Sequence, residues 1–420
     1  MKKPSNENKQ DKIQASLPTA EIVQEELSKA KSIDDFFGKE GIFARLFANT
    51  LEEMLEAELT EHLGYEPHEA KGRNSGDSRN GSYQRKLRTS QGESTIQIPR
   101  DRNGTFEPQI LPKGSAANTN ELEDKIIGMY AKGMSLRDIQ SQLAELYGID
   151  VSASTLSAVT DKVWGLVEEW QNRTLDPIYA IVYLDAIHLK VRRDSKVQNT
   201  AVYIVLGVDL EGQRDVLGHW IGDGGEGANF WLTVISDLQT RGVKDILIAC
   251  MDGLTGFKEA VLAVFPQTEI QRCVIHQIRN SLKYITWQDR GPFMADLRQV
   301  YTAATLEAAQ AGLETLGQKW RSKYAVAVRS WENNWEDLTT FFDFPAEIRR
   351  LIYTTNTVEG YNRQLRKITK SKGAFPSAQA ARKLLFLINR DITKKWAGSL
   401  LQWPLILNQL TIRFEQRLSV

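Results

Sequence analysis

The sequence has few residues that could build a disulfide framework or a membrane anchor. Its 420 residues include only two cysteines, Cys250 and Cys273, so neither a disulfide scaffold nor a multi-cysteine zinc site is expected. No apolar run approaches the roughly 20 residues that span a bilayer. The stretch from Met1 to Leu17 is polar and lacks the apolar centre of a signal peptide. We therefore expect a cytoplasmic protein without a membrane partner.

The chain also lacks an excess of either charge. Lys and Arg number 53, as do Asp and Glu, which argues against a uniformly basic nucleic-acid binder. The charges are nevertheless unevenly distributed, because acidic residues dominate from Phe36 to Leu63 whereas Lys71 to Arg102 is mainly basic. The basic stretch would suit a polyanion. The alternative is a solvated loop with scattered charge.

The length of the chain predicts more than one module, because single cores stop growing at roughly 250 to 300 residues. Residues 1–33 are polar and predict a flexible arm that becomes helical near Ile22 to Ala30. Apolar residues at helical spacing predict a helix from Gly41 to Leu63, and Lys71 to Lys113 predicts hairpin strands and loops. Together these form an expected helical and basic hairpin region, residues 34–115.

Three short helices are predicted in residues 116–175. An apolar stripe indicates the first, and Ser135 and Asp138 have the spacing of a capping box, in which each side chain satisfies the other's backbone donor at the start of the second. Ser152 or Ser154 would cap the third. The pattern fits a helix-turn-helix DNA-binding domain, although an ordinary helical bundle has the same pattern. If the domain binds DNA, the expected contacts are Arg137, Ser154, Thr155 and Ser157.

Beyond Asp176 the pattern changes to strands. Three stretches rich in β-branched and aromatic residues predict an antiparallel meander, followed by helix, strand, helix and strand. This order is that of a ribonuclease-H-like fold, though other α/β folds share it. The expected parts are a core from residues 176–272 and 345–395, an all-helical insertion from 273–344 and a C-terminal helix from 396–420.

Two aspartates lie where a charge is costly. Asp185 lies within one apolar strand and Asp252 directly follows another, and a buried carboxylate needs a partner or a metal ion. Each aspartate alone is equally a common turn former. Glu359 lies on a predicted helix with basic residues after it. If the three converged, their oxygens would suit Mg²⁺ or Mn²⁺, and two such ions about 3.5 to 4 Å apart support phosphodiester chemistry.

Four sequence segments resemble the successive signatures of bacterial insertion-sequence transposases of the Mutator superfamily. They are Asp185 to Arg192, Asp252 to Phe257, Arg272 to Asn280 and Thr355 to Arg363. The resemblance implies an Asp-Asp-Glu transposase that uses two Mg²⁺ or Mn²⁺ ions, with Asp185, Asp252 and Glu359 as catalytic and metal-binding residues. It also implies an α/β ribonuclease-H-like core with an all-helical insertion, preceded by a mainly helical DNA-binding region.

The resemblance further implies DNA partners, namely the terminal inverted repeats and the target, on the bacterial nucleoid. At least a homodimer is expected because two ends must be brought together. Two other functions remain open. One is a catalytically inactive DNA-binding regulator derived from a transposase, and the other is a nonspecific nuclease. The intact carboxylates argue against the first, and the helix-turn-helix pattern argues against the second.

Three further groups of residues receive expectations. Cys273 and His276 match the family's Cys-x-x-His element, and because no second Cys/His pair exists we expect a structural role near Asp252 rather than zinc binding. The helix after Glu359 is expected to contact phosphates, with solvated surface as the alternative. Its basic face comprises Arg363, Arg366, Lys367 and Lys370. The tryptophans Trp320, Trp331 and Trp335 are expected in the core of the insertion, with stacking on a flipped base as the alternative.

Overall fold

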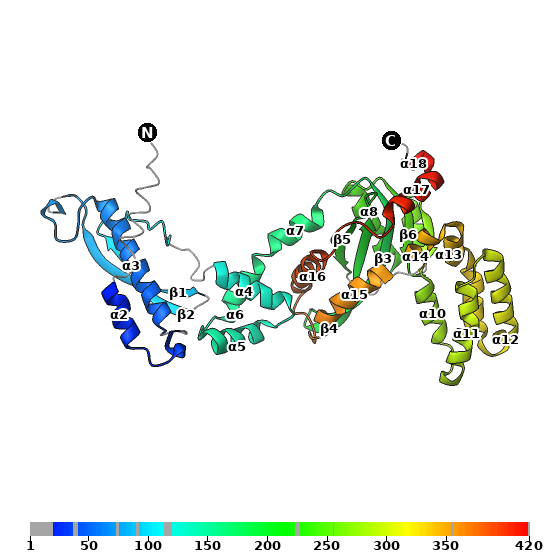
Figure 1. The fold of residues 1–420 in the computed structure, drawn as a ribbon, viewed down its shortest axis with the longest axis horizontal. Coiled ribbons are helices and arrows are strands. Elements are labelled where there is room, and N and C mark those ends of the chain that lie inside the picture. Colours follow the sequence, from blue (N-terminus) through cyan, green and yellow to red (C-terminus); the bar gives the residue numbers. More distant parts are fainter. Residues whose placement is uncertain are drawn as a thin grey trace. The chain divides into compact units, whose positions relative to one another are not determined.

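The chain forms two compact units, Met1–Lys162 and Val163–Val420, each described here by itself (Figure 1). The computed structural model describes residues 20–36, 41–72, 75–89, 92–112, 120–222, 227–254, 256–353 and 356–418. Most of the expected N-terminal arm, residues 1–19, lies outside these ranges, and so do Thr255 and Thr355 of the family-like segments. Within the described ranges, no helix has both the length and the apolar character needed to cross a membrane.

The first unit contains a helix packed on a β-hairpin. The apolar stripe of α3 (Ile42–Leu63) is buried against the antiparallel strands β1 (Arg79–Thr89) and β2 (Gly92–Asp101), with Leu55 of the helix and Ile96 of the hairpin in one cluster. Much of the predicted stripe is therefore covered within the chain, although Phe47 is 43% exposed. Shorter elements around the pair are α2 (Ala20–Ser28), η1 (Ile33–Phe36) and η2 (Ala70–Gly72).

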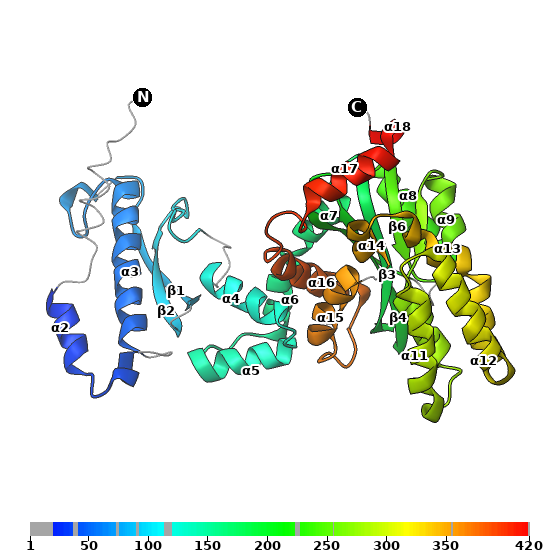
Figure 2. The same cartoon turned by 45° about the vertical axis from the view of Figure 1, so that its right-hand side comes forward.

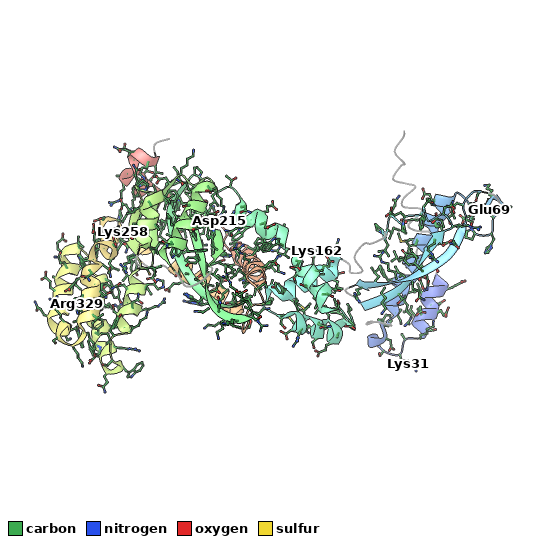
Figure 3. All side chains as sticks on the ribbon, turned by 180° about the vertical axis from the view of Figure 1, so that it is seen from behind. Lys31, Glu69, Lys162, Asp215, Lys258 and Arg329 are labelled. Carbon is green, nitrogen blue, oxygen red and sulfur yellow. The ribbon has the colours of Figure 1, made fainter. Side chains whose placement is uncertain are left out.

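Three helices complete the first unit: α4 (Asn120–Ala131), α5 (Leu136–Tyr147) and α6 (Ala153–Asp161). The capping box predicted for Ser135 and Asp138 is present at the start of α5, and Ser152 caps α6 by accepting from the Thr155 amide at 3.2 Å. Near the end of the unit, Lys162 forms an ion pair of 2.6 Å with Glu123 of α4 (Figure 3). The caps at Ser135 and Ser152 explain why α5 and α6 begin where they do.

The second unit is built on a five-stranded mixed sheet in the order β5-β4-β3-β6-β7. The strands are β3 (Ile178–Arg193), β4 (Lys196–Val208), β5 (Arg214–Ile221), β6 (Asp245–Met251) and β7 (Glu269–Arg272). The first three form the predicted meander, and β6 and β7 run parallel to β3. The hairpin of β3 and β4 ends in a turn at Asp194 and Ser195, which take positive φ angles of 46° and 63°.

Helices cover both faces of this sheet (Figure 2). Val182 and Leu184 of β3 belong to a core shared with α8 (Ala228–Thr240) and α9 (Phe257–Val264), in which the rings of Trp231 and Phe257 stack at 4.2 Å. Because side chains alternate along a strand, Tyr183 and Asp185 point to the opposite face. That face carries α15 (Asn356–Thr369) and α16 (Ala378–Thr393).

The remaining helices border the sheet. The predicted insertion, residues 273–344, begins with α10 (Val274–Leu282), η3 (Trp287–Asp289), α11 (Arg290–Tyr301) and α12 (Leu306–Asn333), and α12 packs against both α10 and α11 (Figure 1). Its last residues form α13 (Trp335–Thr339) and η4 (Thr340–Asp343). After it come α14 (Ala346–Ile352), α17 (Trp403–Arg413) and α18 (Glu415–Leu418). The helix α7 (Trp164–Asn172) packs on β5 and α16, so the boundary between units falls after Lys162, earlier than the expected boundary at residue 175.

Candidate active site

Asp185 lies in the middle of β3, on the face covered by α15. Its side chain is 8% exposed, and Oδ2 accepts a hydrogen bond of 2.5 Å from Asn362 Nδ2, while Oδ1 accepts one of 2.9 Å from the Ala186 amide. Burial raises the pKa of this carboxyl and nearby Asp252 raises it further, whereas His276 and Arg366 oppose the shift. The predicted cost of placing a charge in this strand is therefore present.

Glu359 reaches the same face from the first turn of α15. Arg279, on α10, places Nη1 2.7 Å from Glu359 Oε1. The contact is close enough for an ion pair but lacks hydrogen-bond alignment, so that buried Oε1 receives no hydrogen bond. Asn362 Oδ1, one turn later, is also buried without a donor. Two buried acceptor oxygens in the cleft of Asp185 thus lack a hydrogen bond, one of them with only the Arg279 ion pair, and a metal cation would satisfy both.

Asp252 follows β6 directly, as the sequence predicted. Its Oδ1 accepts from the Gly253 amide at 2.6 Å and lies 4.0 Å from His276 Nδ1. Burial alone would lower the pKa of His276, but the contact with Cys273 and the charges of Asp252 and Asp185 raise it to about 9. Both aspartates thus favour the protonated form of His276.

An open cleft of about 500 Å³ joins most of these groups. It is lined by Asp185, His276, Arg279, Glu359, Asn362, Arg363, Gln364, Arg366, Lys367 and Lys370. Asp252 is not among the lining residues and meets the cleft through His276. Within the described part of the chain, the four predicted cations of α15 make no ion pair and are exposed. The cleft therefore combines buried carboxylates with unneutralised positive charge.

Comparisons with known proteins agree with the resemblance. The family described as "Transposase, Mutator family" matches residues 19–399. The chain belongs to the Mutator family of transposases. It is 42% identical over 394 residues to a probable transposase for insertion sequence element ISRM3-like of Sinorhizobium fredii, covering 94% of this chain and 97% of that protein. It is 26% identical over 372 residues to the transposase for IS256 in transposon Tn4001 of Staphylococcus aureus, covering 88% and 94%.

One solved structure, the Drosophila P element transposase strand transfer complex, matches this Mutator-family chain with a TM-score of 0.35 at 10% identity. The alignment covers 66% of this chain and 93% of the P element protein. So weak a likeness supports no statement about the site.

Two residues that contact the carboxylates of the cleft in this Mutator-family chain had received no role from the sequence. Asn362 lies within a family-like segment but follows Glu359 by three positions, and only the packing of α15 on β3 brings its amide to Asp185. Arg279 lies one turn after His276 on α10. Helix periodicity could have predicted both residues, because each lies one turn after a predicted site residue and on the same side of its helix.

A buried network holds α15 on the sheet of this family member. His219 Nε2, on β5, lies 2.7 Å from the Tyr361 hydroxyl, which donates to Asn389 Oδ1 on α16 at 3.1 Å. Burial, with a smaller contribution from Arg173, lowers the pKa of His219 to about 3, so the imidazole is neutral. Since the hydroxyl proton points to Asn389, His219 donates from Nε2 to the hydroxyl oxygen.

Cys273 and His276 lie at the start of α10. Cys273 is a fully buried free thiol, and its backbone amide donates to Met251 O at 2.8 Å, which joins the segment to the end of β6.

Elsewhere, in the first unit, His62, Asp77 and Asp101 place their potential ligand atoms within 4.8 Å of one another. The carboxylates of this second cluster already accept hydrogen bonds that close the ends of the hairpin, from the amides of Arg102 and Thr105.

The predicted DNA contacts of the first unit lie on α5 and α6. Arg137 is exposed in the first turn of α5. Ser154 and Thr155 share the Ser152 hydroxyl, at 2.8 Å and 2.9 Å, and Ser157 donates to Asp161 at 3.4 Å. The polar residues thus gather at the start of α6, while Arg137 stands on the neighbouring helix.

The tryptophans of the insertion serve mainly as core. Trp320 is 8% exposed and donates to Asp296 at 2.7 Å, and Trp331 is 2% exposed and donates to Ser281 at 2.9 Å. Trp335 is half-buried at the start of α13. The prediction of a core role is confirmed for Trp320 and Trp331.

Proposed function

We propose that the chain is the transposase of an insertion sequence. It would bind the terminal inverted repeats of its element and cut and join DNA strands, with two Mg²⁺ or Mn²⁺ ions held by Asp185, Asp252 and Glu359. The observation that carries the proposal is the cleft, in which carboxylates from β3 and α15 stand beside four exposed cations on α15. A site that cuts DNA requires both kinds of group, because cations must neutralise the phosphates at the place where the carboxylates support the reaction.

The residues present fit a hard divalent cation. Asp185, Asp252 and Glu359 offer carboxylate oxygens, which Mg²⁺ and Mn²⁺ prefer, and Glu359 Oε1 is buried without a hydrogen-bond donor. When bound, such ions supply activation of the attacking oxygen and stabilisation of the leaving oxygen. The protein orients its own groups for this: Asn362 fixes the rotamer of Asp185 by donating to Oδ2. The cations of α15 would hold the flanking phosphates without reading sequence.

The proposal includes a ribonuclease-H-like core. The sheet order β5-β4-β3-β6-β7, an antiparallel meander continued by two parallel strands, supports it. We propose the helices of residues 116–175, with Arg137, Ser154, Thr155 and Ser157, as the end-binding part, and at least a homodimer on DNA in the bacterial cytoplasm. Cys273 and His276 are proposed as structural supports beside Asp252.

A strand-transfer assay with labelled inverted-repeat ends tests the proposal. We expect the wild-type chain to join ends to a target only with divalent cations, and we expect Asp185→Ala, Asp252→Ala and Glu359→Ala to lose cleavage and joining while retaining end binding. Hydrolysis without joining would point to a nuclease instead. Binding without either reaction would point to a regulator. Strand transfer retained by one variant would remove that residue from the site.

A further inference from the structure

Arg272 connects the loop of Asp252 to the far end of the helical insertion. It is the last residue of β7, paired in the sheet with Met251, the residue before Asp252. Its Nη2 donates to the Gly253 carbonyl at 2.6 Å, and its Nη1 donates to Asn334 Oδ1 at 2.6 Å. One guanidinium thus bridges two segments far apart in sequence.

The fit of Arg272 against the loop is tight. A methyl group at Gly253 would lie 1.7 Å from Arg272 Nη2, closer than any pair of such atoms approaches. A side chain at residue 253 would therefore displace the guanidinium, which lies directly against the backbone after Asp252. The planar guanidinium meets two acceptors in different directions, which a lysine ammonium on a flexible stem reproduces poorly.

The other end of the bridge is anchored. Asn334 follows α12 directly and donates from Nδ2 to Ser330 O at 2.6 Å. Gln277 of α10 reaches the Ser330 hydroxyl at 2.7 Å, and Lys258 of α9 pairs with Asp337 of α13 at 2.6 Å (Figure 3). The end of α12 is thus fixed to the elements that surround β7.

We infer that Arg272 is a positioning residue that sets the orientation of Asp252 for metal binding, using the end of the insertion as its support. The inference rests on the proposed function. Among the described residues, Asp252 itself contacts its following amide and, at the longer distance of 4.0 Å, His276 of α10. Arg272 instead makes two hydrogen bonds of 2.6 Å, which tie the next residue, Gly253, to Asn334 at the end of α12. Partners that orient metal ligands of this kind govern metal affinity rather than DNA binding.

The test compares Arg272→Gln, Arg272→Lys and Asn334→Ala with Arg349→Gln, in the full-length chain bound to end DNA. Arg349 is a matched control, because its guanidinium also bridges two acceptors, the backbone carbonyls of Phe344 and Phe342, but does not line the cleft. Mn²⁺ binding is measured by electron paramagnetic resonance titration, alongside the Mg²⁺ concentration for half-maximal joining. End affinity is measured in EDTA.

We expect Arg272→Gln and Asn334→Ala to weaken Mn²⁺ binding by about tenfold or more and to raise the Mg²⁺ midpoint equally, with end affinity unchanged. The Mn²⁺ affinity and the Mg²⁺ midpoint of Arg272→Lys should lie between those of these variants and those of the wild type, because one ammonium can bind one of the two acceptors. Arg349→Gln should leave both metal measurements unchanged. Equal metal behaviour of Arg272→Gln and Arg349→Gln would overturn the inference, and if Arg272→Gln fails to fold, Asn334→Ala decides. A wild-type chain that neither binds Mn²⁺ nor joins ends would instead refute the proposed function.

Discussion

Tyr361 joins α15 to the two elements beneath it through a single hydroxyl group. We expect Tyr361→Phe to lower the free energy of unfolding by about 1 to 3 kcal/mol, because His219 Nε2 and Asn389 Oδ1 would both lose their buried partner. Urea unfolding of the full chain measures this. Tyr284→Phe is the control, since Tyr284 is 55% exposed and the change should stay within about 0.5 kcal/mol. Equal effects of the two changes would show that the network contributes nothing.

His219 also gives the fold a pH dependence. Burial, with a smaller contribution from Arg173, lowers its pKa in the folded state to about 3, whereas an unfolded histidine titrates near 6.5. The unfolded chain therefore binds the extra proton first, and stability is lost as the pH falls below about 6.5. Between pH 7.5 and pH 5 we expect the wild type to lose about 2 kcal/mol more than His219→Gln. This prediction would be contradicted if the free energies of unfolding of the two proteins changed by the same amount over this pH range.

The two faces of α15 differ in burial and in charge. Val358, Tyr361 and Leu365 are buried against the sheet, whereas the basic residues that follow Glu359 are exposed along the cleft. Glu359 and Arg363 are four positions apart, a spacing that also allows an ion pair within the helix. The structure instead pairs Glu359 with Arg279 of α10 and leaves Arg363 facing the cleft.

We therefore expect Arg366→Ala and Lys370→Ala each to reduce the slope of log DNA affinity against log salt by about 0.9, the value for one lost phosphate contact. Fluorescence anisotropy with end DNA across a salt series measures this. Arg382→Ala on α16 is the matched control, because Arg382 is exposed but does not line the cleft. Unchanged slopes and affinities in the first two variants would show the basic face to be solvated surface.

Sequence predicted the elements whose signals are local. The capping box of α5 needs only Ser135 and Asp138, three residues apart, and the apolar run of β6 has turn residues beyond it, so both were located correctly. The bond between Asn362 and Asp185 spans 177 positions, and the bridge from Arg272 to Asn334 spans 62. Such contacts depend on how helices dock on the sheet, which no local pattern encodes.

The two compact units divide the proposed work of the whole molecule. The first unit holds the four residues proposed to contact the ends, Arg137, Ser154, Thr155 and Ser157, and the second holds the whole cleft. No helix or strand carries both the proposed end-contacting residues and the residues of the cleft, because the first unit ends at Lys162, before the sheet begins. Substitutions on one side should therefore change one activity and leave the other intact.

We expect Arg137→Ala to reduce the preference for end DNA over random duplex by about 1 to 3 kcal/mol, as loss of a base contact does, while joining at saturating end DNA proceeds at the wild-type rate. Arg137 is exposed and takes no part in the Ser135 and Asp138 cap, so α5 should remain folded. Glu359→Gln should show the reverse, with the preference intact and joining lost. Competition binding at fixed salt and single-turnover joining measure the two quantities. If Arg137→Ala slowed joining at saturation yet kept its preference for the ends, recognition would have to be sought elsewhere in the chain, and the proposed separation would be wrong.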